Sequence, residues 1–306
     1  MSEAAYAAAA RAKINLYLHV TGRRSDGYHL LDSLIVFTAC GDTVEAHDGD
    51  RLSLEVAGPF AAAVPNGEGN LVLRAARALA AAAGVKAGAH LRLIKRLPPA
   101  SGIGGGSADA AATLFALMSL WGVRPADDDL ARIALDLGAD VPVCLGGAPA
   151  FVGGIGERLD PAPTLPEVSI VLANPGIAVA TVEVFRSRGG PFSAPARFTS
   201  PPPDARTLAG LLAERRNDLT DPAVRLAPPI RTLLDHLSRL QGALLARMSG
   251  SGATGFALFA DAAEAEAAAA TLRAAHPSWW VAQTVIAAPE PPTICPLPWP
   301  ERRLRQ

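Results

Sequence analysis

The chain lacks several features that mark common functional classes. Its three cysteines, Cys40, Cys144 and Cys295, are far apart and form no Cys-x-x-Cys pair for a metal or a redox centre. No apolar run approaches the length of a transmembrane helix, and the first residues have no basic region ahead of an apolar core. We therefore expect a reduced, cytoplasmic chain with no membrane partner.

Net charge and aromatic content are also low. Lys and Arg number 28 against 29 Asp and Glu, which gives a formal net charge of −1. Such a balance provides no long-range attraction for nucleic acid, so we expect no nucleic-acid partner and only local binding of phosphate groups. Aromatic residues make up 5% of the 306 residues, although 50% are hydrophobic. This predicts cores of Ala, Leu and Val in one large or two ordinary domains.

The most informative stretch is the glycine-rich segment 97–111, which runs into the apolar residues 112–118. Residues without a β-carbon let the backbone adopt a positive φ and approach a ligand, and the helix that follows begins with unpaired N–H groups. Together with the helix dipole, these groups favour a bound phosphate. A flexible linker is the alternative, but linkers do not usually lead into a capped apolar helix.

Two other phosphate-binding patterns do not fit this segment. A Walker A loop would end in Gly-Lys-Ser/Thr, whereas the residue five after Gly102 is Ser107 and no lysine follows. The third glycine of a dinucleotide fingerprint would also fall at Ser107, and no acidic residue stands at the expected distance on a second strand. A dinucleotide-dependent oxidoreductase is therefore disfavoured.

Apolar and polar residues alternate over 12–20, which predicts a half-buried strand with Lys13 on its polar side. By this pattern alone, Lys13 belongs either to a solvated face or to a site. The polar turn 22–27 follows and leads to Tyr28 and His29. An aromatic ring beside a hydrogen-bonding ring could clamp a flat base, and it could equally pack in a core.

Three further polar positions have both a structural and a functional interpretation. Asn70 can cap a helix over 71–83, and Lys95 stands at the end of a strand beside the glycine loop, where it fits phosphate binding or solvation. Asp140 precedes a hydrophobic turn, where it is either a helix N-cap or a functional carboxylate. The acidic run 127–129 is typical of a helix N-terminus rather than a metal site.

A domain boundary is expected in the glycine- and proline-rich segment 146–166. Beyond it, the sequence predicts strand 168–173, a short helix near 181–186, helices 204–216 and 228–240, strands 243–248 and 255–260, helix 261–276 and strand 279–287. With the two middle helices counted as one layer, this is the β-α-β-β-α-β order of a ferredoxin-like half. The small-residue loop 249–254 lies between its middle strands.

Three separated segments resemble the GHMP small-molecule kinases: an N-terminal strand with a lysine, the Pro-Pro-x-x-Gly-Ile-Gly loop from Pro98, and the Ser-Gly-Ser-Gly-Ala loop from Ser249. Within that family, segments 12–16, 22–29, 102–107 and 137–142 are similar to the branch that acts on a cytidine-diphosphate-linked methylerythritol. That branch serves the non-mevalonate route to isoprenoids (the MEP pathway), and the resemblance covers about residues 9–287.

The resemblance implies a two-domain α+β fold with the site in a cleft between the halves. Residues 1–163 would form the N-terminal GHMP kinase domain, an α/β half like domain 2 of ribosomal protein S5. Residues 164–288 would form the C-terminal ferredoxin-like half. The proline-dense residues 289–306 are expected to be an extended or disordered tail.

The resemblance also assigns roles, with Lys13 and Asp140 as the catalytic pair. The implied ATP-binding residues are Asn70, Lys95, Pro98, Pro99, Ala100, Ser101, Gly102, Ile103, Gly104, Gly105, Gly106, Ser107 and Ala108. The implied substrate-binding residues are Asn15, Tyr28, His29, Ile155, Thr181 and Phe185. Gly105 and Gly106 stand where many members of the wider family have Ser-Ser, so the protein ligands of Mg²⁺ stay open.

The implied reaction is ATP-dependent phosphorylation of the 2-hydroxyl of the cytidyl substrate, by one chain or a homodimer. A kinase for homoserine, mevalonate or a sugar would share the glycine loop, but the turn to Tyr28 and His29 favours a substrate that carries a nucleotide. A non-catalytic nucleotide-binding module would keep the loops and have no use for Lys13 and Asp140 together.

Overall fold

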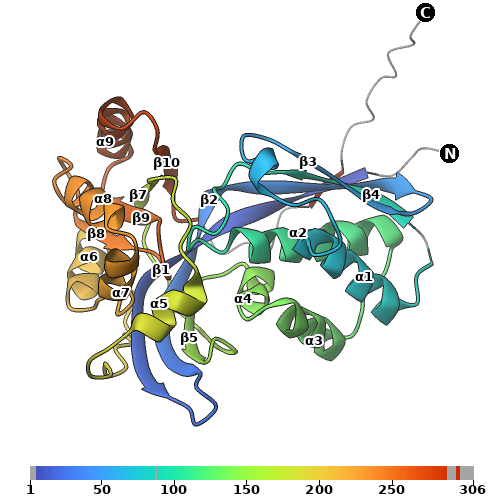
Figure 1. Cartoon of the computed structure of the whole chain (residues 1–306), viewed down its shortest axis with the longest axis horizontal. Helices are drawn as coiled ribbons and strands as arrows, with labels where there is room; N and C mark the ends of the chain where they lie inside the picture. Colours follow the sequence, from blue (N-terminus) through green and yellow to red (C-terminus); the bar gives the residue numbers. More distant parts are fainter. Residues whose placement is uncertain (1–4, 87, 288–293, 297–306) are drawn as a thin grey trace, which may run out of the picture.

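Two β-sheets with helices packed against them make up the described part of the chain (Figure 1). The computed structural model describes residues 5–86, 88–287 and 294–296. The larger sheet contains β1 (Ala5–Arg23), β2 (His29–Gly49), β3 (Leu52–Ala57), β4 (Gly88–Ile94), β5 (Ala150–Gly154), β6 (Arg158–Pro161) and β11 (Ile294–Pro296). The smaller sheet contains β7 (Ser169–Asn174), β8 (Leu245–Met248), β9 (Gly255–Phe259) and β10 (Trp280–Val285).

The larger sheet is built around the long antiparallel pair β1–β2. Its order is β11-β1-β2-β4-β3, with β5 pairing to β2 and β6 to β5. The register of β1 against β2 shifts at three places, one of them between Arg11 and Lys13. β11 extends this sheet from the predicted tail, whose other residues lie outside the described ranges.

The prediction that residues 12–20 form a half-buried strand is wrong in one respect, because every residue of this segment is buried. The apolar Ile14 and Leu16 belong to a core that both sheets share, and Lys13 and His19 are buried as well. Alternation of apolar and polar residues predicts a solvent-exposed polar face only where no other part of the chain covers that face. Here the glycine loop and the second half of the chain cover that face.

The helices of the first half are α1 (Leu71–Ala83), α2 (Gly105–Trp121), α3 (Asp127–Leu137) and α4 (Val141–Gly146), and η1 (Ala61–Ala63) is a single 3-10 turn. As the sequence predicts, the Asn70 side chain accepts from Val72 N at the start of α1, and Gly84 ends the helix in the left-handed conformation. α2 is apolar on all sides because β1, β2, α1 and α4 surround it.

The smaller sheet confirms the ferredoxin-like expectation, since its antiparallel order is β10-β7-β9-β8. Ile170 and Leu172 of β7 face the shared core, whereas Val171 and Ala173 pack in a second core with α8 and α9. The helices of this half are α5 (Thr181–Ser187), α6 (Ala205–Ala213), α7 (Thr220–Leu226), α8 (Pro229–Ser238) and α9 (Ala262–Ala275). Among the described residues, no helix is long and apolar enough to cross a bilayer.

A partly buried arginine joins the two halves. Arg247 of β8 donates to the Leu16 carbonyl of β1 at 2.7 Å and to the carbonyls of Leu212 and Arg215 at 2.8 and 2.6 Å. Burial, with a smaller contribution from the neighbouring Arg215, lowers the pKa of Arg247 to about 10, so the guanidinium stays charged at neutral pH.

We expect Arg247→Met to lower the free energy of unfolding by about 3 kcal/mol, because three partly buried carbonyls lose a charged donor. Urea unfolding followed by circular dichroism measures this loss. The control is Arg206→Met on the exposed side of α6, which should change stability by less than about 0.5 kcal/mol. Equal effects of the two substitutions would show that Arg247 does not hold the halves together.

Candidate active site

A cleft of about 1010 Å³ opens between the two halves of the chain. Its walls come from β1, the turn before β2, the glycine loop, the start of α4, the helix α5 and the loop 249–254. The predicted residues that line it are Lys13, Asn15, Tyr28, His29, Ala100, Ser101, Gly102, Gly104, Gly105, Gly106, Ser107, Asp140, Ile155, Thr181 and Phe185. Segments that are far apart in the sequence therefore converge on one cavity.

Lys13 and Asp140 form an ion pair in this cleft, with 3.1 Å between Nζ and Oδ2. The Lys13 side chain is 6% exposed and the Asp140 side chain 46%. Asp140 stands at the N-cap position of α4, but within the described part of the chain its side chain makes no capping hydrogen bond. Both simpler interpretations, a solvated lysine and a capping aspartate, are therefore wrong.

Asn15 holds the Lys13 ammonium from the other side. Lys13 Nζ donates to Asn15 Oδ1 at 3.0 Å, and Asn15 Nδ2 donates to the Ser33 hydroxyl at 2.9 Å. That hydroxyl donates in turn to the Tyr17 carbonyl. The chain of donors fixes the Asn15 amide with its oxygen toward Lys13. The ammonium therefore has a defined position, while the Asp140 carboxylate faces the open cleft.

The glycine loop places the N-terminus of α2 against this pair. Gly104 is the N-cap with φ 65°, and the helix that begins at Gly105 has no side-chain cap among the described residues. A β-carbon at Gly104 would lie 3.0 Å from Lys13 Cε. The N–H groups of the first turn therefore face a cavity beside a lysine ammonium, an arrangement that binds phosphate.

Four of the predicted loop residues, Pro98, Pro99, Ile103 and Ala108, do not line the cleft. Ile103 is fully buried in the shared core, and its carbonyl accepts from Lys13 N. These residues fix the loop from behind. Asn70 is also absent from the lining because its side chain caps α1, although the next residue, Leu71, reaches the cleft.

Lys95 lies beneath the glycine loop rather than in the cleft. Its Nζ is bound by Asp42 Oδ2 at 2.6 Å and Asp109 Oδ2 at 2.7 Å, and its side chain is 3% exposed. A β-carbon at Gly105 would lie 3.1 Å from this Nζ. Lys95 therefore supports the loop from below, and its ammonium is shared by two carboxylates.

The two partners of Lys95 were not found by sequence reasoning. Asp42 Oδ1 also accepts from the backbone N–H groups of Arg96 and Leu97, so it fixes the start of the loop. Asp109 belongs to α2, just after the loop. The Asp42–Lys95–Asp109 cluster thus ties together both ends of the glycine loop. The sequence does show acidic residues near the loop, but their spacing does not indicate that two of them bind the same lysine.

The far end of the cleft carries aromatic rings. His29 stacks on Phe185 of α5 with 5.3 Å between ring centroids and 27° between planes, and Tyr28 beside them is 62% exposed. Burial lowers the pKa of His29, and the positive charges of Arg23 and Arg188 lower it further. The ring is therefore neutral at pH 7 and can both donate and accept hydrogen bonds.

The loop 249–254, from the second half of the chain, closes one side of the cleft. The sequence indicated this loop but not the contacts that it makes. Ser249 Oγ donates to the Gly102 carbonyl and accepts from Asn15 N. Asn217, placed just before α7, donates to the Gly250 carbonyl at 2.8 Å. A β-carbon at Gly102 would lie 2.6 Å from the Ser249 carbonyl oxygen, so only glycine allows the two loops to touch.

Family models match both halves of the chain. A model described as the GHMP kinases N terminal domain matches residues 70–148, and one described as GHMP kinases C terminal matches residues 203–278. Relatives called 4-diphosphocytidyl-2-C-methyl-D-erythritol kinase match over most of the length. The protein from Paramagnetospirillum magneticum is 58% identical over 273 residues, which cover 89% of this chain and 95% of the relative. For Rhodospirillum rubrum the identity is 53%, with 89% and 90% covered.

Solved structures agree with these matches. A crystal structure of 4-(cytidine 5'-diphospho)-2C-methyl-D-erythritol kinase superimposes with a TM-score of 0.75 at 37% identity, covering 92% of this chain and all of that one. Homoserine kinase from Cytophaga hutchinsonii superimposes with a TM-score of 0.66 at 17% identity, covering 96% and 98%. At that identity the second likeness concerns the fold alone.

The cluster beneath the loop predicts a pH-dependent stability. Burial and the nearby Asp42 raise the pKa of Asp109 from 3.8 to about 7, and Asp109 Oδ1 has no hydrogen-bond partner among the described residues. The folded chain keeps this proton up to about pH 7, whereas the unfolded chain releases it near pH 4. Asp109 therefore makes stability fall as the pH rises between these values.

Asp109→Asn keeps the shape and removes the titration, so it should reduce the loss of unfolding free energy between pH 5 and pH 8 by more than about 1 kcal/mol. Urea unfolding at each pH compares the substituted and unsubstituted proteins. Asp50→Asn at an exposed turn is the control and should leave the pH dependence unchanged. An unchanged pH profile in Asp109→Asn would mean that Asp109 stays ionised.

Proposed function

The chain belongs to the GHMP kinases, in the branch of the 4-diphosphocytidyl-2-C-methyl-D-erythritol kinases, and from this membership we propose its reaction. It transfers the γ-phosphoryl group of ATP to the 2-hydroxyl of 4-diphosphocytidyl-2-C-methyl-D-erythritol, giving the 2-phosphate and ADP in non-mevalonate isoprenoid biosynthesis. The observation that carries this proposal is the convergence of three parts in one cleft. These are the glycine loop, the Lys13–Asp140 pair and the aromatic group of Tyr28, His29 and Phe185.

Phosphoryl transfer needs positioning and charge neutralisation more than covalent help. The N–H groups at the start of α2 hold the phosphates of ATP, and they stabilise the charge that develops as the γ-phosphoryl group leaves. The Lys13 ammonium, fixed by Asn15 and Asp140, meets the transferred group between donor and acceptor. Asn15 also lines the cleft and is placed to contact the erythritol part of the substrate.

Asp140 receives or orients the proton of the attacking hydroxyl. Its carboxylate, paired with the Lys13 ammonium at 3.1 Å, accepts a hydrogen bond from the hydroxyl and can take its proton as the new P–O bond forms and the bond to ADP breaks. Because an aspartate is a weak base toward an alcohol, orientation of the hydroxyl contributes together with deprotonation. The 46% exposure of Asp140 leaves room for the substrate on its open side.

Mg²⁺ is part of the same proposal. No group of three His, Cys, Asp or Glu side chains that could cage a metal occurs among the residues with described positions. Mg²⁺ does not need one, because it is commonly held by one or two carboxylates together with substrate phosphates and water. Asp140 and the Ser107 hydroxyl are oxygen donors that line the cleft. When bound, the ion neutralises phosphate charge.

The division into domains 1–163 and 164–288 and a cytoplasmic location belong to the proposal too. The first is supported by the change from the larger to the smaller sheet between β6 and β7. The second is supported by the free thiols of Cys40 and Cys144 and by the cytoplasmic supply of ATP.

The runner-up is another small-molecule kinase, because the fold is shared with homoserine kinase. The stacked His29 and Phe185 beside an exposed Tyr28 favour the cytidyl substrate, since homoserine and mevalonate have no aromatic base to stack. A substrate panel separates these possibilities.

Purified protein with Mg-ATP should release ADP only when the cytidyl substrate is present, and Asp140→Asn should lower kcat at least about a hundredfold. A coupled ADP assay measures both. Asp128→Asn at the exposed start of α3 is the matched control and should keep the parental rate. If ADP release does not depend on the cytidyl substrate, the proposed function is wrong. If the kcat of Asp140→Asn stays within a few-fold of the parental kcat, the proposed role of Asp140 is wrong.

Tyr28→Ala should raise KM for the cytidyl substrate about tenfold, leaving KM for ATP unchanged and kcat within about twofold, because the loss of a stacking ring weakens ground-state binding. Initial rates at varied concentrations of each substrate give the constants. Leu135→Ala on the exposed side of α3 removes a similar exposed apolar surface away from the cleft and serves as the control. An unchanged KM would show that Tyr28 does not contact the base.

A further inference from the structure

Three arginines at the aromatic end of the cleft have no part in the mechanism above. Arg23, Arg186 and Arg188 all line the cavity. The carboxylates on the same lining are already paired, Asp26 with Arg24 at 2.7 Å and Asp140 with Lys13. This end of the cleft therefore carries an excess of positive charge.

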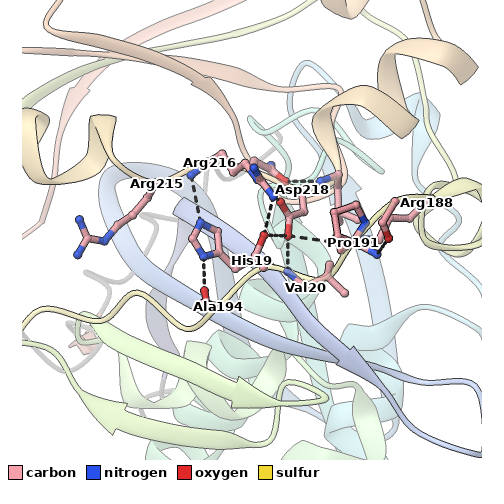
Figure 2. Close-up of polar contacts among 12 residues, drawn as sticks. His19, Val20, Arg188, Pro191, Ala194, Arg215, Arg216 and Asp218 are labelled. Carbon is pink, nitrogen blue, oxygen red and sulfur yellow. Dashed lines mark hydrogen bonds and ion pairs between the residues drawn. The ribbon is translucent and has the colours of Figure 1, made fainter.

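Arg188 is the arginine whose position is fixed. It follows α5, its side chain is 5% exposed, and it donates to the carbonyls of Gly190 and Pro191 at 3.3 and 2.5 Å. Figure 2 shows it beside Asp218. The guanidinium Nη2 lies 4.0 Å from Asp218 Oδ2. By contrast, Arg186 is solvent-exposed and pairs with Glu183 on the surface of α5.

Asp218 does not fully compensate Arg188. The Asp218 carboxylate accepts from Val20 N at 2.8 Å, from Ser193 Oγ at 2.7 Å and from Arg216 Nε at 2.6 Å (Figure 2). Its distance of 4.0 Å to Arg188 is longer than a hydrogen bond. In addition, Arg188 Nε is buried and has no hydrogen-bond partner in the described part of the chain. A fixed guanidinium that lines the cleft and is only partly paired is a group that an anionic ligand can complete.

The charge of Arg188 reaches the aromatic end of the cleft. Arg23 and Arg188 are the two charged groups that lower the pKa of His29, after burial itself. Arg23 Nε donates to the Gly27 carbonyl at 3.1 Å, which places its guanidinium beside the turn that carries Tyr28. Both arginines therefore border the rings that would hold a base.

We propose that Arg188, assisted by Arg23, binds the diphosphate of the nucleotide part of the substrate, an inference that rests on the proposed function. In that substrate the diphosphate joins the cytidine to the methylerythritol. With the base at Tyr28, His29 and Phe185 and the hydroxyl at Asp140, the diphosphate must cross the cleft between them. A guanidinium matches phosphate oxygens in shape and charge, and this one is held by the protein before binding.

Binding of cytidine, CMP and CDP to the whole chain, measured by isothermal titration calorimetry, tests the proposal. We expect the unsubstituted protein to bind CDP at least tenfold more tightly than cytidine. Arg188→Met should reduce this ratio about tenfold and leave the affinity for cytidine within about twofold. Arg188→Lys keeps the positive charge but lacks the paired N–H donors of a guanidinium, so it should restore part of the ratio of CDP affinity to cytidine affinity.

Arg225→Met is the matched control. Arg225 of α7 donates to the Ser187 carbonyl next to Arg188 but does not line the cleft, so its substitution should leave the ratio unchanged. If Arg188→Met keeps the parental ratio, or weakens cytidine and CDP equally, Arg188 is structural and the proposal is overturned. If that variant does not fold, the lysine variant decides, together with the salt dependence of the ratio in the unsubstituted protein, which should fall as salt rises.

The outcomes also separate this proposal from the proposed function. An unsubstituted protein that phosphorylates the cytidyl substrate yet binds CDP no better than cytidine would overturn the diphosphate site alone. If the protein binds none of the three ligands and releases no substrate-dependent ADP, both the diphosphate site and the proposed function are wrong.

Discussion

Burial of the Lys13 ammonium is the constraint on which the rest of the site depends. A charged amine that is 6% exposed is stable only beside a carboxylate and further acceptors, and Asp140 and Asn15 supply them from α4 and from β1 itself. Meeting that requirement brings the start of α4 to the first strand. It also leaves the Asp140 carboxylate half-exposed next to a fixed cation. A carboxylate needs this geometry if it is to accept a hydrogen bond from a substrate hydroxyl. Stability and chemistry therefore impose the same contact.

The position of Lys13 in turn requires two loops from different halves to meet. The Lys13 N–H donates to the Ile103 carbonyl in the glycine loop, and Asn15 N donates to Ser249 Oγ in the loop 249–254. Backbone contact between the loops leaves no space for a β-carbon at Gly102. The small residues of both loops thus serve close packing as well as ligand approach. A side chain added at this junction would displace the glycine loop relative to the lysine.

Local patterns in the sequence predicted most helices and strands, because capping residues and periodicity act within one element. Asn70 with Gly84 and the acidic start of α3 are clear cases. The family resemblance predicted many of the residues that line the cleft, but six of its site residues lie outside the lining and the arginines that line the aromatic end were not among its predictions. Neither source predicted the partners of Lys95, because a lysine bound by two carboxylates depends on tertiary contacts between β2, β4 and α2. Alternation in β1 failed for the same reason, since what covers a strand is not encoded in the strand.

The two ends of the cleft differ in charge, and this difference explains how two anionic ligands can each bind at a defined end. At the glycine-loop end, Lys95 is bound by the side chains of Asp42 and Asp109, so its charge is compensated and the backbone N–H groups are the donors left for a phosphate. Such donors bind a polyphosphate by shape, with little long-range attraction. At the aromatic end, Arg188 retains charge that Asp218 only partly offsets. In the proposed arrangement, a nucleotide that needs both a stacked base and a paired diphosphate binds at that end, and the glycine loop holds a triphosphate whose γ-group reaches Lys13. Under that proposal, the arrangement of charges directs the phosphoryl donor and its acceptor to opposite sides of one lysine.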